Sequence, residues 1–227
     1  MSHMNSTFVD TQCSQPEAVL SLRDILGQLD QYRSRPVKGF DVLRDYTDYC
    51  VDPRVAAVFI ECAVAADRVD LAEMVLPMAQ DKTGIFGAMI QMAKGNPKQA
   101  LDALNTIPDD PRHQVYAYGL RIQANVMIRQ YDAASKAVFD WATAMPLSPQ
   151  PFRTMGNALA KRNDPRAERW FERAVNVSGG GSGAVLDMAA FLIKQGRKTE
   201  AGGRLDSLEY VLGRNKRRKM RLQRELA

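Results

Sequence analysis

The sequence predicts an all-α fold in which antiparallel helix hairpins stack into an α-solenoid. Three observations lead to this prediction. Apolar residues recur at helical spacing along most of the chain. No stretch of any length shows the apolar–polar alternation of a half-buried strand. Short turn segments rich in Gly, Asn and Asp recur, and each leads into an alanine that opens another helical pattern.

The sequence pattern in the first quarter of the chain predicts helices joined by short loops. Residues 1–15 are polar, begin with the cloning-type remnant MSHM, and are expected to be disordered. Residues 16–52 show two helical patterns, the first ending at Pro36 and the second rich in tyrosine. Asp52 is a natural N-cap and Pro53 fits the first turn of the helix that follows.

The rest of the chain contains an internal repeat. The segments KGNPKQALDAL, KRNDPRAERWF and KQGRKTEAGGRL resemble one another, and IRQYDAASKAV fits less well. The alanines that open their helical patterns are spaced by 34, 33 and 34 residues, and are Ala100, Ala134, Ala167 and Ala201. Ala72 suggests an earlier, degenerate unit. Small residues upstream of each turn would let two helices cross closely, and are Ala88, Ala124, Gly156 and Ala189.

This period and its small residues resemble the tetratricopeptide repeat (TPR) family. Tyr118, Tyr131 and Phe171 stand at aromatic places of the pattern, and Pro146 lies near a unit end. The resemblance implies a right-handed superhelix of helix hairpins. The implied TPR-like repeats span residues 53–213 and are 53–79 (degenerate), 80–110, 111–146, 147–180 and 181–213.

The glycine-rich stretch SGGGSG at residues 178–183 has three interpretations: a phosphate loop, an engineered spacer or a turn. A phosphate loop needs Gly-x-x-x-x-Gly-Lys-Ser/Thr after a buried strand, but Gly183 is followed by Ala184. The glycines lie within one 34-residue period. We therefore predict a turn between helices over about 165–177 and about 184–195, with a flexible spacer as the alternative.

The TPR resemblance implies a concave groove, lined by the first helix of each hairpin, that holds a partner's peptide or helix. The expected role is protein binding as an adaptor, scaffold, assembly factor or secretion-type chaperone, as in bacterial TPR proteins of secretion or pilus assembly. The predicted groove residues are Ile85, Met89, Met92, Tyr116, Gln123, Met127, Arg153, Asn157, Lys161 and Leu186. A methionine-bearing groove suits an apolar segment or amphipathic helix.

Three alternatives remain open at this point. The methionines Met89, Met92 and Met127 have an equally good interpretation as core residues. The N-terminal helices either extend the solenoid or fold back into the groove. Exposed terminal helices could also stack on a second copy and form a homo-oligomer.

The C-terminal segment 214–227 is strongly basic. It forms either a solvated capping helix or an electrostatic contact with nucleic acid, an acidic protein or an anionic membrane surface. Its cations are Arg214, Lys216, Arg217, Arg218, Lys219, Arg221 and Arg224. Because no aromatic residue interleaves with them, base stacking is disfavoured as a mechanism.

Catalytic, metal and cofactor chemistry find little support, and we predict a non-enzymatic protein without a cofactor. The cysteines Cys13, Cys50 and Cys62 fit no metal spacing and predict reduced thiols. Beside His3 of the remnant, His113 is the one histidine. No apolar run reaches the roughly 20 residues of a membrane span, and no signal-peptide pattern is present, so a cytoplasmic location is expected.

Overall fold

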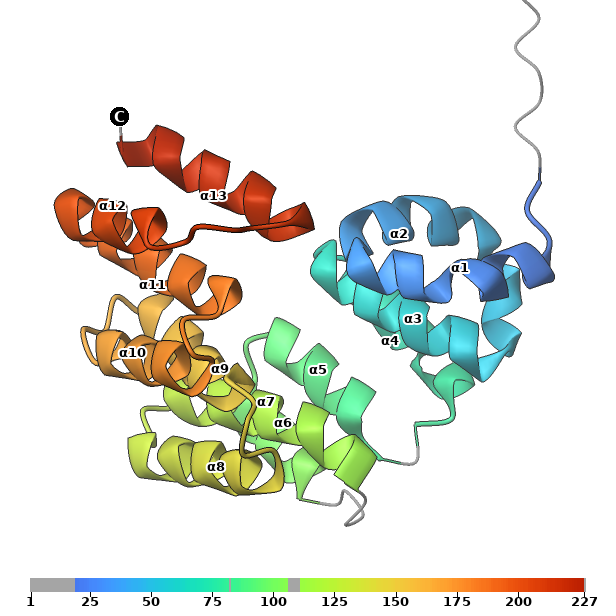
Figure 1. The fold of residues 1–227 in the computed structure, drawn as a ribbon. Coiled ribbons are helices and arrows are strands. Elements are labelled where there is room, and N and C mark those ends of the chain that lie inside the picture. Colours follow the sequence, from blue (N-terminus) through green and yellow to red (C-terminus); the bar gives the residue numbers. More distant parts are fainter. Residues whose placement is uncertain (1–18, 82, 106–110, 227) are drawn as a thin grey trace, which may run out of the picture.

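The computed structural model describes residues 19–81, 83–105 and 111–226 (Figure 1). Every regular element within these ranges is a helix and none is a strand, so the prediction of an all-α fold is confirmed. The segment 1–15, expected to be disordered, lies outside the described residues, and so does Cys13.

The chain begins with α1 (Leu22–Ser34), α2 (Pro36–Leu43), the 3-10 helix η1 (Arg44–Val51) and α3 (Pro53–Ala65). Pro36 ends the first helical pattern, but it does so as the first residue of α2. The second pattern is not one α-helix, since Tyr46 leaves helical geometry at φ −126° and ψ 34°. Asp52 caps α3 as predicted, its side chain accepting the Arg54 N–H at 2.9 Å.

The remaining elements alternate with short turns. They are α4 (Val69–Val75), η2 (Leu76–Ala79), α5 (Ile85–Ala93), α6 (Pro97–Leu104), α7 (Pro111–Met127), α8 (Tyr131–Ala144), α9 (Gln150–Ala160), α10 (Ala167–Val177), α11 (Ser182–Lys194), α12 (Lys198–Asp206) and α13 (Gly213–Leu226).

Successive helices pack as hairpins. We call α3, α5, α7, α9 and α11 the first helices, and α4, α6, α8, α10 and α12 the second helices of five hairpins. Each first helix contacts its own second helix and the first helix of the next hairpin. Each second helix up to α10 also contacts the next first helix. In Figure 1, α8, α10 and α12 follow one another along the outer edge, with α9 and α11 on the inner side.

Five turns of one kind join the first and second helices. In each turn, a residue at positive φ donates its N–H to the carbonyl three residues earlier, and the next N–H bonds to the carbonyl five residues earlier. This is the Schellman motif, which satisfies the last carbonyls of a helix. The positive-φ residues lie 28, 34, 34 and 33 positions apart, and are Asp67, Gly95, Arg129, Asn163 and Gly196.

The repeated small residues are buried where the hairpins cross. The alanines Ala72, Ala100, Ala134, Ala167 and Ala201 are all 0% exposed. Gly156 packs so tightly against Phe171 that an added Cβ would lie 2.7 Å from the ring. Ala88, Gly156 and Ala189 each lie seven positions before the positive-φ residue of their turn. Ala124 is buried too, but it lies five positions before its turn, and the larger Ile122 occupies the seventh position.

The SGGGSG stretch is a turn, as predicted. Gly179 and Gly180 have φ of 57° and 80°, a region that glycine enters at little cost. The N–H of Gly179 bonds to the Asn176 carbonyl at 3.1 Å, and that of Gly180 to the Val175 carbonyl at 2.9 Å. The stretch therefore ends α10 with a Schellman motif, and Gly181 is the N-cap of α11.

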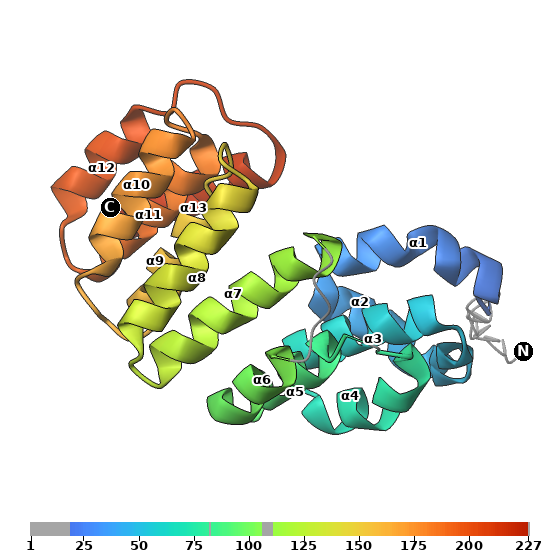
Figure 2. The same cartoon turned by 90° about the horizontal axis from the view of Figure 1, so that it is seen from below.

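Additional helices pack at both ends of the hairpins. In Figure 2, α1–α4 form one end of the molecule and α9–α13 the other. The main contacts of α1 and α2 are with each other and with α3, and α2 also contacts η1. Within the described residues, the N-terminal helices thus lie against the first hairpin rather than along α7, α9 and α11. At the opposite end α13 packs on α11 and α12.

Candidate interaction surfaces

One face of the first helices is exposed at matching positions in successive hairpins. In the last four of the five turns, the residues six positions before the positive-φ residue are Met89, Gln123, Asn157 and Ala190. Those two positions before it are Ala93, Met127, Lys161 and Lys194. All eight are partly or fully exposed, whereas the residues five and seven positions before the turn are buried. Residues four apart share a helix face, so we call these eight the first-helix stripe.

The stripe includes half of the residues predicted for the groove. Met89, Gln123, Met127, Asn157 and Lys161 all belong to it. Tyr116, which is 61% exposed, extends it along α7 because it lies seven residues before Gln123. Met127 is 36% exposed and Met89 is half-buried, so the core interpretation fits Met89 better than Met127.

Four predicted groove residues lie elsewhere. Ile85 and Leu186 are 6% and 0% exposed and belong to the hydrophobic core, so neither is available to a partner. Both stand ten positions before their turn, where the helix directs them toward neighbouring helices. Met92 is half-buried against the same cluster as Ile85. Arg153 is engaged in an ion pair.

That ion pair belongs to a buried cluster that the sequence prediction missed. The carboxylate of Asp187 in α11 is 5% exposed and accepts Nε of Arg153 in α9 at 2.6 Å. Its other oxygen lies 2.6 Å from Nη1 of Arg218 in α13. One available signal was Asp187 itself, the single charged residue in the otherwise apolar run before Lys194. A lone acid on a buried face requires cationic partners.

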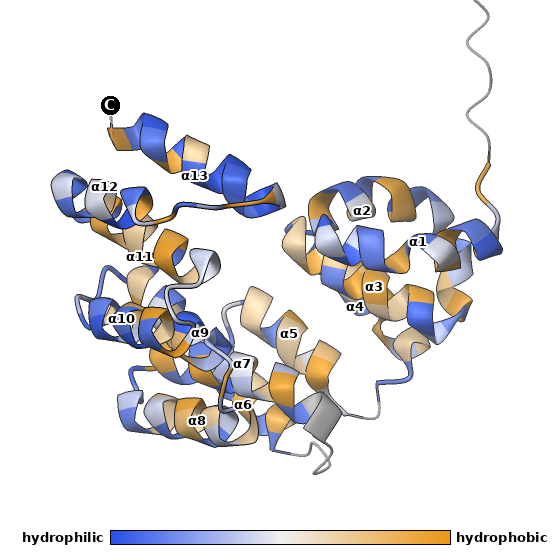
Figure 3. Cartoon of the chain, in the orientation of Figure 1, coloured by the Kyte–Doolittle hydropathy of each residue, from blue (hydrophilic) through white to orange (hydrophobic). Residues whose placement is uncertain are grey.

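Two cations of the predicted basic patch have structural roles. Arg218 binds Asp187, and Nζ of Lys219 donates to the Leu208 carbonyl at 2.7 Å. Nε of Arg221 lies 3.8 Å from Oε1 of Glu225, and both side chains are exposed. The remaining cations are exposed along α13, which is largely hydrophilic in Figure 3, and are Arg214, Lys216, Arg217 and Arg224.

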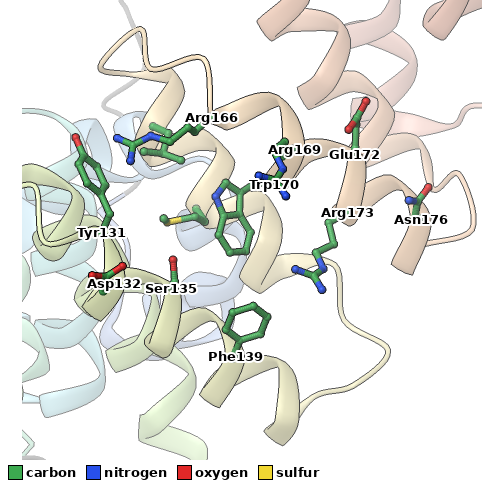
Figure 4. Close-up of a pocket in the computed structure, with 12 residues that line it drawn as sticks. Tyr131, Asp132, Ser135, Phe139, Arg166, Arg169, Trp170, Glu172, Arg173 and Asn176 are labelled. Carbon is green, nitrogen blue, oxygen red and sulfur yellow. The ribbon is translucent and has the colours of Figure 1, made fainter.

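A cleft of about 600 Å³ lies between the second helices α8 and α10 (Figure 4). Tyr131 and Phe139 of α8 face Trp170 and Arg173 of α10 across it. No predicted site residue lines this cleft. A signal was present in the helical spacing of Arg166, Arg169 and Arg173, which places three cations on one face.

Buried titratable groups occur near the N-terminal end. Burial raises the pKa of the Cys50 thiol to about 11. Burial also raises the pKa of Cys62, to about 12, with a smaller contribution from the charge of Glu61. Both thiols are free and buried, as expected of small apolar residues, and they stay protonated at neutral pH.

Further features bear on the class of site. Among the described residues, no group of three or more His, Cys, Asp or Glu side chains could hold a metal ion. The side chain of His113 lies outside what the structure describes. None of the described helices has the length and apolar character needed to cross a bilayer. Comparisons with protein-family models, curated proteins and solved structures gave no match, so the proposals below rest on the chain's own geometry.

Proposed function

We propose that the chain is a non-enzymatic protein-interaction module, a right-handed superhelix of TPR-like hairpins that binds a partner along the first-helix stripe. The supporting observation is that equivalent positions of four successive first helices are partly or fully exposed. The stripe combines the thioethers of Met89 and Met127 with the amides of Gln123 and Asn157. Such a surface suits an extended peptide or amphipathic helix with an apolar anchor and polar flanks.

The expected cellular role is that of a cytoplasmic adaptor, assembly factor or chaperone. The hairpins would act as a rigid scaffold, since each contacts the next through both of its helices. A long row of exposed side chains could then contact several residues of a partner at once.

Site-specific photo-crosslinking tests this proposal. A photoreactive amino acid would replace Gln123 or Asn157 on the stripe, or Lys136 on α8 as the control, whose side chain is 78% exposed. We expect one partner to be crosslinked from both stripe positions and not from the control. Equal capture from all three positions would contradict the proposal.

The captured partner, once purified, allows a quantitative test. Met127→Glu places a charge within the apolar part of the stripe and should weaken binding at least about tenfold, or 1.4 kcal/mol. Lys136→Glu on α8 should leave the Kd unchanged. Both values come from fluorescence anisotropy of a labelled partner fragment. An unchanged Kd for Met127→Glu would move the binding site off the stripe.

A second candidate function is supported by the exposed cations of α13. Arg214, Lys216, Arg217 and Arg224 could contact nucleic acid or an anionic surface electrostatically. Binding of a single-stranded oligonucleotide should then fall with rising salt, with a log–log slope of about −0.7 per phosphate contacted. Arg217→Glu should make the slope shallower. A slope that stays unchanged in this variant would exclude α13 as the contact.

A further inference from the structure

The cleft between α8 and α10 has an aromatic centre that is partly open to solvent. The Phe139 ring, on α8, is 45% exposed and its centroid lies 6.1 Å from that of Trp170 on α10. Trp170 stacks in turn on Phe152 at 6.3 Å. Exposed aromatic rings that are fixed by their neighbours bind apolar side chains at little entropic cost.

Guanidinium groups border this aromatic centre. Arg173 lies over the rings of Phe139 and Phe152, with its Cζ 5.4 and 5.6 Å from their centroids. Arg166 covers the face of Tyr131 at 3.7 Å and pairs with Asp164 at 2.6 Å. Figure 4 shows Arg166, Arg169 and Arg173 along one side of the cleft.

The basic character continues beyond the end of the cleft. A second depression of about 460 Å³ shares Tyr131 with it and is lined by three more cations, Arg129, Lys161 and Arg162. Across both depressions, six basic side chains face three acidic ones, which are Asp132, Asp164 and Glu172. Asp164 is already bound by Arg166. The surface is therefore complementary to a negatively charged ligand.

We propose that the α8–α10 cleft binds an acidic peptide segment of a partner protein, with an aromatic or large aliphatic residue flanked by Asp or Glu. The apolar residue packs on Phe139 and Trp170. The flanking carboxylates pair with Arg169 and Arg173, whose planar guanidinium groups match carboxylates in a bidentate arrangement.

A peptide fits this surface better than a nucleic acid does. The carboxylates of Asp132 and Glu172 lie within the cleft and would repel a continuous row of phosphates. A peptide can place a backbone N–H or a lysine beside them. Arg166 already covers a face of the Tyr131 ring, so that face is not free for base stacking.

The test uses the full-length protein and a fixed panel of fluorescein-labelled 12-residue peptides. One peptide carries six Asp or Glu residues around a central Phe, and the others lack either the acidic residues or the aromatic residue. A 12-nucleotide oligo-dT serves as the polyanion. We expect only the acidic, Phe-containing peptide to bind in the micromolar range, and to change the tryptophan fluorescence of the protein, to which Trp141 and Trp170 both contribute.

Matched variants locate the site. Arg169→Glu should weaken the peptide at least tenfold, and Phe139→Ala severalfold. Arg23→Glu on α1, at an exposed position outside every proposed site, makes the same change in net charge and should have no effect. Circular dichroism and urea unfolding verify that each variant folds. Met127→Glu on the first-helix stripe should leave peptide binding intact, which separates this site from the stripe.

Three results would overturn the inference. The first is that no peptide of the panel binds. The second is that Arg23→Glu weakens binding as much as Arg169→Glu, which would indicate non-specific charge attraction. The third is that oligo-dT binds as tightly as the peptide and loses affinity in Arg169→Glu, which would assign the cleft to nucleic acid.

Discussion

The terminal helices at the two ends of the stack pack through different interactions. At the N-terminal end, α1 and α2 cover α3 through an apolar layer in which Ile25, Leu43 and Phe59 are 0% exposed. At the C-terminal end, α13 fully buries one side chain, Leu222, and is joined to α9 and α11 through Asp187. The comparison shows that one terminal helix packs through a broad apolar layer, whereas the other combines a narrow apolar contact with a buried charge cluster.

The largest effect is expected at the C-terminal end. Asp187→Ala leaves the guanidinium groups of Arg153 and Arg218 close together without their shared carboxylate. Removing one partner of a buried charge cluster costs about 3–5 kcal/mol. The free energy of unfolding, measured in urea, should fall by that amount.

Asp206→Ala is the matched control, because it removes an exposed acid from the neighbouring α12. Its unfolding midpoint should stay close to that of the unmodified protein. A loss of less than 1 kcal/mol for Asp187→Ala would show that α13 is held mainly by Leu222 and its apolar neighbours.

A slightly smaller effect is expected at the N-terminal end. Ile25→Ala removes a fully buried side chain of α1 and should cost about 2–5 kcal/mol. The buried thiols of Cys50 and Cys62 report on this end directly, since they react with a thiol reagent only when it opens. In a Cys13→Ser background, Ile25→Ala should raise the rate at which Cys50 and Cys62 are labelled more than tenfold.

Val37→Ala on α2 is the corresponding control, because this side chain is 53% exposed. Asp187→Ala should likewise leave the labelling rate nearly unchanged if the two ends open independently. Equal acceleration by Ile25→Ala and Asp187→Ala would mean that the whole chain unfolds as one cooperative unit.

The smallest effect concerns pH at the N-terminal end. Burial raises the pKa of Glu61 in α3, and Arg33 of α1, 3.0 Å away, offsets part of this. The raised pKa contributes stability below the unfolded-state pKa of about 4.3, and this contribution is lost as pH rises through the folded pKa. Glu61→Gln should therefore gain stability relative to the unmodified protein as pH rises above about 4.3, the unfolded-state pKa of Glu. Urea unfolding across this range measures it, and a pH-independent difference would contradict the assignment.

Local sequence signals predicted the hairpins well. Turn residues and alanines recur at a period that helix packing imposes, so the buried alanines and the SGGGSG turn followed from spacing alone. Burial of individual residues was harder, because a shift of one or two positions along a helix separates core from surface. Ile85 and Leu186 were assigned to the groove for that reason, and both lie in the core.

The missed features all depend on contacts between distant parts of the chain. Asp187 binds arginines 34 positions before it and 31 after it. The α8–α10 cleft likewise joins residues from two different hairpins. Periodicity describes one helix at a time, so it cannot show which cations and rings the packing brings together.

The recurring Schellman turns have a consequence for how such a chain could change its length. The segment from Gln130 to Asn163 spans 34 residues and contains one second helix, one first helix and the turn that closes it. A duplicate of this segment inserted after Asn163 would begin and end at equivalent backbone conformations. Tandem duplication or deletion of whole units would therefore preserve the capping hydrogen bonds of the turns, whereas an insertion that is not a whole unit would have to fall within a loop.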